Sequence, residues 1–471
     1  MSIQLFNMSK VLNFFVYSSI FFLNFIPVKD PDFGWHYQCG SNLLSGKPCL
    51  TNTFSYFLSN YQAFNPSFIF DTITAITFNS FGFIGLSILH ASLMTAIFYL
   101  FYRLSKQHIS IAAVAFAIII FLSNGTLGLG WRSQIVTYGL YILGLYVLSR
   151  GKIKTYPVLM LIWVNSHIGF FTGIILYTFY FLDQSIRAMI NKKYKKEWAV
   201  AVAIGVISIG ATLINLFGWK VYKEIFNHLS SPLNTMIAEW IGPSITHIVL
   251  IIILSIVLPI AQTIKRKFTL FQLLNLLFFG ILAIMARRNL PIFYTVAAIQ
   301  ILLLLPKSKS FKNYLFLIFP VVSAICISVA IIHINSTSKF HNDWRTYCTE
   351  GAAHYPCAAL KAYPQISGNV YAAYEWGGFL IWQRPDIKVF SDGRMPAWRD
   401  ENGESPYNVY LHILQTQPGW NETLRKYRTD YLLLAQGTFL DLLLDKEAEG
   451  FDWEKVYENK SHAIYKNLKA Y

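Results

Sequence analysis

Long apolar blocks alternate with short polar segments along the first 334 residues. A helix needs about 20 apolar residues to cross the hydrocarbon core of a bilayer, so blocks of this length predict transmembrane helices. The pattern predicts roughly eleven crossings, and hence a polytopic α-helical membrane protein. The blocks are Val11–Val28, Gly82–Tyr102, Ile109–Leu122, Ile135–Leu148, Pro157–Val164, Phe170–Leu182, Trp198–Leu216, Ile245–Ala261, Phe268–Ala286, Leu290–Leu305 and Tyr314–Ile334.

A different pattern begins at Asn335, where short apolar runs alternate with charged positions. Strands are predicted at Asn369–Trp376, Val389–Gly393 and Tyr431–Leu434, helices at Tyr407–Leu414, Trp420–Arg425 and Phe439–Lys446, and a closing hairpin at Trp453–Tyr465. We therefore expect a transmembrane domain at 1–334, with a long first outer loop at 29–66, and a soluble α/β domain at 335–471. The turn Ser391–Arg394 favours a structural role over a site.

The composition agrees with a membrane protein. Only 13% of the 471 residues are charged and 54% are hydrophobic, whereas soluble domains carry about a quarter charged residues. The net charge of +15 does not point to nucleic acid, because the basic residues stand in short clusters between apolar blocks and no nucleic-acid motif is present.

The basic clusters also predict the topology. Positive charge is retained on the cytoplasmic side, so Lys10, Arg103, Arg150 and Arg187 are expected there with the residues that flank them. The protein is then a multi-pass protein of the inner (plasma) membrane, with a cytoplasmic N-terminus and an extracytoplasmic C-terminal domain.

Two apolar blocks, Pro157–Val164 and Phe170–Leu182, are too short to be two full spans. They share the polar tip Asn165-Ser166-His167. Broken helices are tolerated where they line a wet cavity, so His167 is a candidate for a cavity wall. A plain tight hairpin between two helices is the alternative.

The stretch Asp30-Pro31-Asp32-Phe33-Gly34-Trp35-His36 follows directly on the first apolar block. Two carboxylates and an imidazole therefore stand where hydrocarbon gives way to water, a boundary at which charged groups are costly unless they bind something or titrate. We interpret the stretch as a catalytic loop at the outer face of a membrane. An ordinary polar turn that ends a helix is the alternative, because Asp-Pro-Asp favours turns.

Arginines at the outer helix ends point to an anionic ligand. Arg132, Arg287 and Arg288 all fall on the predicted outer side, against the trend of the other basic residues. Guanidinium groups suit phosphate or pyrophosphate. The alternative is that they pair with lipid headgroups or with Glu239.

Four cysteines form two close pairs in the predicted outer segments, Cys39 with Cys49 and Cys348 with Cys357. Disulfides persist outside the cytoplasm, and each would close a loop of about ten residues, worth on the order of 2–3 kcal/mol. Spacing alone leaves four free thiols as the alternative. Cys326 stands alone in a predicted helix.

An ordered set of motifs resembles bacterial multi-spanning glycosyltransferases of the GT-C superfamily, whose relatives include protein O-mannosyltransferases and the aminoarabinose transferase of lipid A. The resemblance covers most of the chain. The motifs are Asp30-Pro31-Asp32 with Trp35-His36 and Gly40, Thr53-Phe54-Ser55, Arg132 with Gln134, Trp163–Phe170, Asn215–Gly218, Glu239-Trp240, Arg287-Arg288-Asn289 with Pro291, Trp376–Leu380 and Asp392-Gly393-Arg394.

The resemblance implies a transferase that uses a polyprenyl-phosphate-linked sugar outside the cytoplasmic leaflet, with a glycan, lipid or protein as acceptor. It implies that Asp30 or Asp32 is the base or orienter, with Asp30 slightly favoured as the nearer to the membrane. Arg288, with Arg132, would hold the lipid phosphate. The predicted substrate-binding residues are His36, Arg132, His167, Glu239, Arg287 and Arg288.

Enzymes of this type differ in whether they need a divalent metal. Asp30, Asp32 and His36 are ligand types that could hold one, and no metal or other cofactor is assigned. A transporter or flippase of a lipid-linked sugar is the alternative function, although the sequence has no inverted repeat and its charged candidates cluster on one predicted face. A third possible function, a scaffold that binds a partner through its outer domain, would leave the outer Asp and Arg residues unexplained.

Overall fold

The computed structural model describes residues 2–231, 237–306, 312–336 and 355–469. Contacts divide the chain into two compact units. The first comprises Met1–Lys29, Ile84–Val221 and Pro232–Thr337, and the second comprises Asp30–Phe83, Tyr222–Ser231 and Ser338–Tyr471. The first outer loop thus groups with the C-terminal part of the chain, whereas the predicted boundary after residue 334 kept it with the helical part.

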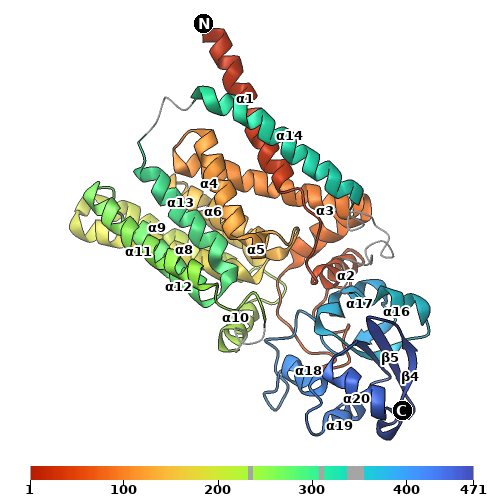
Figure 1. Cartoon of the computed structure of the whole chain (residues 1–471). Helices are drawn as coiled ribbons and strands as arrows, with labels where there is room; N and C mark the ends of the chain where they lie inside the picture. The colour runs from red at the N-terminus through yellow and green to blue at the C-terminus, as the bar shows by residue number, and fades with distance from the viewer. Residues whose placement is uncertain (1, 232–236, 307–311, 337–354, 470–471) are drawn as a thin grey trace. The chain divides into compact units, whose positions relative to one another are not determined.

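The first unit is built of helices, and each of the eleven predicted apolar blocks contains one. The helices are α1 (Ser2–Leu23), the second half of α3 (Phe68–Ser105), α4 (Ile109–Leu122), α5 (Asn124–Leu127), α6 (Ser133–Ser149), α7 (Tyr156–Val164), α8 (Phe171–Ile190), α9 (Lys195–Ala211), α11 (Ile245–Ile264), α12 (Leu270–Met285), α13 (Leu290–Leu304) and α14 (Lys312–Ser336). Helix α10 (Lys220–Ser230) was not predicted, and its residues from Tyr222 onward belong to the second unit. In Figure 1, α1 and α14 lie along one another.

By length and hydropathy, two helices among the described residues could cross a membrane, α3 and α11. Shorter apolar helical stretches of 10–17 residues account for Lys10–Leu23, Ile109–Leu122, Ser133–Ser149, Ile153–Val164, Leu270–Met285 and Ile318–Ile332. The predicted helices are therefore present, and the count of about eleven crossings stays a prediction.

Polar side chains join the helices inside the first unit. The Tyr141 hydroxyl donates to Asn275 Oδ1 at 2.9 Å, which links α6 to α12. Gln262 donates to Gln300 at 3.0 Å, which links α11 to α13. Such bonds hold helices together where the hydrophobic effect does not, as in a bilayer.

Helix α3 is two helices joined at Gly82, whose φ of 60° and ψ of −154° are not helical. Residues before this break belong to the second unit and those from Ile84 onward to the first. The earlier half exposes Ile69, Ile73 and Ile76 on one face and buries Phe70 on another. Both of these faces are apolar, and the break at Gly82 means that the earlier half is not the first part of one straight span.

The second unit contains a five-stranded sheet of order β2-β1-β3-β5-β4. The strands are β1 (Gly368–Ala372), β2 (Ile387–Val389), β3 (Tyr431–Ala435), β4 (Trp453–Glu458) and β5 (His462–Asn467), and β1 runs parallel to β2 and β3 while β5 is antiparallel to β3 and β4. Its helices are α16 (Cys357–Ala362), α17 (Gly377–Gln383), α18 (Pro406–Leu414), α19 (Trp420–Lys426) and α20 (Phe439–Glu447). The predicted C-terminal α/β region, its three helices and its closing hairpin are confirmed.

Two predicted strands differ from the observed ones. The first ends at Ala372 and gives way to α17, because Trp376, Phe379 and Leu380 follow helical spacing and are all buried. The second prediction, Val389–Gly393, was wrong except at Val389, because the observed strand β2 covers Ile387–Val389 and residues 390–394 form a bend and a turn. Both differences lie where the chain approaches the candidate site.

The first outer loop is part of this unit. It forms α2 (Phe33–Leu44) and then runs along the edge strand β2, where Ser55 makes a parallel bridge with Val389. The Phe54 carbonyl accepts from the Val389 N–H at 3.1 Å, and the Ser55 hydroxyl donates to the Phe390 carbonyl at 3.0 Å. The loop therefore covers a sheet edge that would otherwise present unpaired backbone groups.

Candidate functional site

The predicted site residues fall into two groups, one in each unit. Asp30, Asp32 and His36 lie in the second unit, and Arg132, His167, Glu239, Arg287 and Arg288 lie in the first.

Asp30 and Asp32 form a tight turn at the start of α2. Asp30 is 4% exposed, and its Oδ1 accepts from the Asp32 N–H at 3.4 Å, while its carbonyl accepts from the Phe33 N–H at 3.2 Å. Asp32 is half-buried and stands at the N-cap of α2, but its carboxylate does not cap the helix. Asp30 therefore shapes the turn, and the carboxylate of Asp32 is the more accessible of the two.

The Asp32 carboxylate lies against the turn that follows β2. A Cβ added at Gly393 would stand only 1.8 Å from Asp32 Oδ1, so no other residue fits at position 393 without displacing the carboxylate. Next to this glycine, Asp392 is fully buried. The Asp392–Arg394 turn, which the sequence favoured as structural, thus borders one of the candidate catalytic residues.

Burial and the negative charge of these carboxylates raise the pKa of two tyrosines. Burial raises the pKa of Tyr355, and the charges of Asp30 and Asp32 raise it further. Burial likewise raises the pKa of Tyr374, with added contributions from Asp32 and Asp392. Both hydroxyls therefore stay protonated, and they lie within electrostatic reach of the carboxylates.

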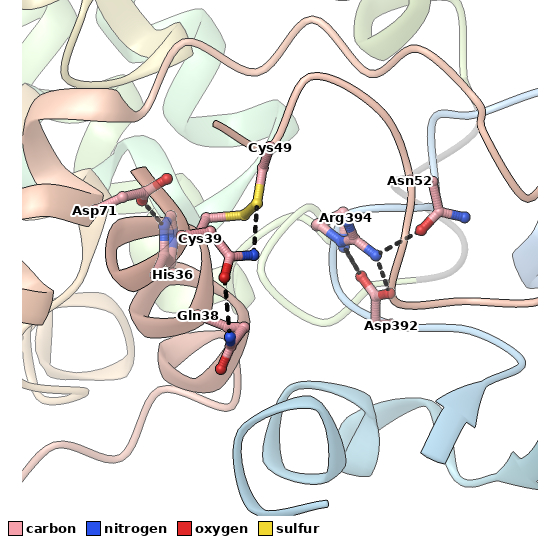
Figure 2. Close-up of a disulfide and its surroundings, with 9 residues drawn as sticks. His36, Gln38, Cys39, Cys49, Asn52, Asp71, Asp392 and Arg394 are labelled. Atoms are coloured by element: carbon pink, nitrogen blue, oxygen red, sulfur yellow. Dashed lines mark hydrogen bonds and ion pairs between the residues drawn. A yellow bond between two sulfur atoms is a disulfide. The ribbon is translucent and has the colours of Figure 1, made fainter. Parts of the chain in front are cut away.

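Arg394 neutralises part of this acidic cluster. Its Nε and one terminal nitrogen donate to the two oxygens of Asp392, both at 2.7 Å, and the same terminal nitrogen donates to Asn52 Oδ1 at 3.0 Å. The guanidinium also lies over the rings of Phe54 and Trp398, 5.0 and 5.3 Å from their centroids. Figure 2 shows Arg394 between Asp392 and Asn52, so this arginine ties the C-terminal turn to the first outer loop.

His36 faces Asp71, from the first half of α3, at 2.5 Å, and both side chains are buried. Its ring also stacks on Trp35, with centroids 3.5 Å apart. In Figure 2 the side chains of His36 and Asp71 lie beside the Cys39–Cys49 disulfide. A role for His36 in substrate binding remains a prediction, and the observed contacts tie α2 to α3.

The Cys39–Cys49 disulfide is present, which confirms the first predicted pair. Cys357 takes part in a disulfide, but Cys348 lies outside the described residues, so the second pair stays a prediction. Cys326 is free.

Across the described ranges, no group of three or more His, Cys, Asp or Glu side chains is arranged to hold a metal ion. Of the three residues considered for such a site, His36 pairs with Asp71.

Glu239 organises the group in the first unit. Arg132, buried at the start of α6, donates to both Glu239 oxygens at 3.0 and 3.2 Å, and Gln134 donates to one of them at 2.9 Å. Burial opposes ionisation of Glu239, but the charges of Arg132 and Arg288 outweigh it and lower the pKa of Glu239 to about 2. Glu239 is therefore charged at neutral pH and pairs with Arg132, which is the alternative interpretation of that arginine.

Arg288 completes this group from the turn between α12 and α13. Its backbone N–H donates to the Glu239 carbonyl at 3.2 Å, and its guanidinium lies 4.2 Å from the centre of the Trp240 ring. Burial lowers the pKa of Arg288, while Glu239 raises it. Two guanidinium charges, those of Arg132 and Arg288, thus act on one carboxylate, which leaves the group a net positive charge. Arg287 is exposed beside it.

His167 lies in the turn between α7 and α8 and contacts Thr137 on α6. Its Nδ1 is 2.8 Å from the Thr137 hydroxyl and accepts from the Gly169 N–H at 3.0 Å, and Trp163 donates to the same hydroxyl. His167 is thus held in the short turn between α7 and α8. This position agrees with a cavity wall and equally with a tight hairpin between two helices.

Sequence reasoning missed Asp71, Tyr355 and Tyr374 as neighbours of the candidate residues. Their only signal is a polar atom on an otherwise apolar segment, which does not identify a partner far away in the sequence, whether 35 positions away as for Asp71 and His36 or several hundred as for the two tyrosines. Trp240 was noted only as a motif, and Asp392 and Arg394 were favoured as a structural turn.

No family model matches this chain, and no curated protein matches it. Several solved structures do match this chain. The oligosaccharyltransferase of Archaeoglobus fulgidus in its apo form has a TM-score of 0.56 and 11% identity, over 91% of this chain and 69% of that chain. The archaeal oligosaccharyltransferase AglB from Archaeoglobus fulgidus, in complex with an inhibitory peptide and a dolichol-phosphate, has a TM-score of 0.53 and 10% identity, over 95% and 71% of the two chains.

ArnT from Cupriavidus metallidurans, bound to undecaprenyl phosphate, has a TM-score of 0.52 and 11% identity, over 98% of this chain and 97% of that chain. At such identities the likeness shows the fold alone. The chain has a mostly helical fold like that of GT-C membrane glycosyltransferases, with a mixed α/β region at its C-terminal end. The expected resemblance in fold is thereby confirmed.

Proposed function

We propose that this protein is a membrane glycosyltransferase that moves a sugar from a polyprenyl-phosphate donor to an acceptor on the extracytoplasmic face. The observation that carries the proposal is the fold likeness to ArnT over nearly the whole of both chains. That structure contains undecaprenyl phosphate, and the AglB structure contains a dolichol-phosphate. The acceptor is a hydroxyl or amide group of a glycan, lipid or protein.

In the proposed step, the acceptor oxygen or nitrogen attacks the anomeric carbon of the sugar. The bond from that carbon to the phosphate oxygen breaks, and the polyprenyl phosphate leaves. The acceptor proton passes to a carboxylate, for which Asp32 is the better placed because Asp30 is engaged in the turn. Asp30 and the Asp392–Arg394 turn would position Asp32.

The arginine group of the first unit would hold the phosphate. Glu239 orients Arg132 and supports Arg288, and the net positive charge favours a ligand whose charge increases as the bond breaks. A guanidinium group already aligned by a carboxylate loses little freedom when phosphate binds.

Binding of undecaprenyl phosphate to the purified full chain tests the role of the arginines. A charge-assisted hydrogen bond contributes about 1.5–3 kcal/mol, so Arg288→Gln is expected to weaken binding by roughly tenfold or more. Lys196→Gln, an exposed lysine on α9, is the matched control and should bind as the unmodified protein does. Equal affinity of Arg288→Gln and the control, or equal affinity for undecaprenol without its phosphate, would contradict this role.

A further inference from the structure

A polar cavity lies in the first unit, away from the arginine group around Glu239. It has a volume of about 400 Å³ and lies where α3, α6, α8 and α13 end and α12 begins. Arg132 precedes α6 and Arg150 follows it, and a helix of 17 residues is about 25 Å long. The cavity and the Glu239 group are therefore at opposite ends of α6.

The rim of this cavity is cationic. Arg103, Lys106, Arg150 and Arg187 line it, against a single carboxylate, Asp183, which pairs with Arg187 at 2.7 Å. Part of this positive charge compensates the partial negative charge at helix C-termini. Arg150, for example, donates a hydrogen bond to the Arg103 carbonyl near the end of α3 at 3.2 Å. Four cations around one carboxylate still leave the rim positive, although these side chains come from three separate segments of the sequence.

The floor is made of buried amides. Asn275 and Gln300 are each 1% exposed, and the Gln300 amide donates to the Gln272 carbonyl at 2.9 Å. Within the described residues, the side-chain oxygen of Gln272 is buried and has no hydrogen-bond partner. A buried acceptor without a donor is unfavourable, and a ligand hydroxyl group would supply the missing donor.

An adjoining cavity of about 460 Å³ repeats this chemistry. It shares Lys106, Gln272 and Gln300 with the first, and it adds Lys267 and Gln262. The side-chain oxygen of Gln262, which is 2% exposed, also has no hydrogen-bond partner among the described residues. Together the two cavities have cationic side chains at the rim and, inside, amide oxygens that can accept hydrogen bonds from the hydroxyl groups of a ligand.

We propose that this cavity binds a phosphate ester of a small polyol, with the phosphate among Arg103, Arg150 and Arg187 and the hydroxyl groups on the amide floor. The phosphoglycerol group is such a ligand, either free or as the headgroup of a lipid. A wholly apolar ligand would leave the buried amides unsatisfied, and an inorganic anion would leave the floor unused. This proposal does not depend on the transferase activity.

The test uses the full chain in nanodiscs of zwitterionic lipid, to which sn-glycerol 3-phosphate is added, and in nanodiscs that contain phosphatidylglycerol. Either the soluble ester or the anionic lipid is expected to raise the thermal unfolding temperature, and the arm that responds identifies the source. The double variant R150Q/R187Q should lose at least tenfold in affinity for that ligand. K192Q/K193Q, which removes two exposed lysines from the turn after α8, is the matched control.

A second variant, Gln272→Leu, tests the floor and separates a binding defect from misfolding. It should weaken binding of the polyol phosphate several-fold while leaving inorganic phosphate unaffected. The proposal is overturned if neither ligand raises the unfolding temperature, if the control variant loses affinity as much as R150Q/R187Q, or if inorganic phosphate binds as tightly as glycerol 3-phosphate.

Discussion

At the scale of single residues, Glu224 on α10 carries a buried carboxyl in the second unit. It is 2% exposed, its Oε1 lies 3.5 Å from His228, and burial raises its pKa to about 7 against the influence of the Phe64 N–H and Lys223. An ordinary glutamate in the unfolded chain has a pKa near 4.5. Between these values the folded protein binds more protons than the unfolded chain, so stability falls as pH rises from about 4.5 to 7.

Glu224→Gln should remove this pH dependence. The variant is expected to be more stable than the unmodified protein at pH 8 by roughly 1–3 kcal/mol and to differ little from it at pH 4. Thermal unfolding across this pH range measures the difference, with the exposed Glu422→Gln as control. If Glu224→Gln follows the same pH profile as the unmodified protein, the carboxyl is already ionised in the folded state and the account of this residue is wrong.

The sequence identified charged residues at the ends of apolar blocks but could not choose their partners. Arg132 and Glu239 were both candidates, and their ion pair spans 107 positions of the sequence. Pairing with Glu239 had been the alternative to ligand binding, and the structure shows the pair while leaving a net positive charge with Arg288. His36 was a candidate as well, but nothing near it in the sequence indicates Asp71.

At the scale of elements, Gly82 separates the two halves of α3. A backbone with φ of 60° and ψ of −154° is open to glycine and strained for other residues by about 1–3 kcal/mol. Gly82→Ala should therefore lower the thermal unfolding temperature. Gly210→Ala in α9 is the matched control, because a Cβ there meets nothing within 4 Å and alanine favours a helix.

Equal unfolding temperatures for the two alanine variants would mean that α3 runs straight through position 82. The halves would then form one long span, and the first half could not belong to the same compact unit as the outer loop.

The helices were predictable where apolar blocks are long and uniform, as in α4 and α13, because hydrophobic length alone defines them. Helices α10 and α17 are among the elements that were not predicted. Helix α10 alternates charged and apolar residues, and α17 begins with Gly377 and Gly378, which disfavour a helix when considered locally. In both, burial on one face decides the structure, and burial depends on partners elsewhere in the chain.

At the scale of the whole molecule, the fold class could be predicted from block length, low charge and the ordered motifs. The grouping of the first outer loop with the C-terminal part could not be predicted. The bond between Ser55 and Phe390 joins residues 335 positions apart, and no local period indicates such a contact. The basic residues predicted to share one side of the membrane do meet, since Arg103, Arg150 and Arg187 line one cavity.

The central claim is that the protein transfers a sugar and releases a polyprenyl phosphate. The most direct measurement is the appearance of undecaprenyl phosphate when the full chain, in liposomes, is given a panel of undecaprenyl-phosphate-linked sugars and acceptors. We expect release with at least one donor, a loss of at least a hundredfold in Asp32→Asn and a large loss in Asp30→Asn, and unchanged release in the exposed control Glu401→Gln. Full activity of both aspartate variants, or passage of an intact lipid-linked sugar across the bilayer with no release from any donor, would contradict the account, and the second result would identify a transporter.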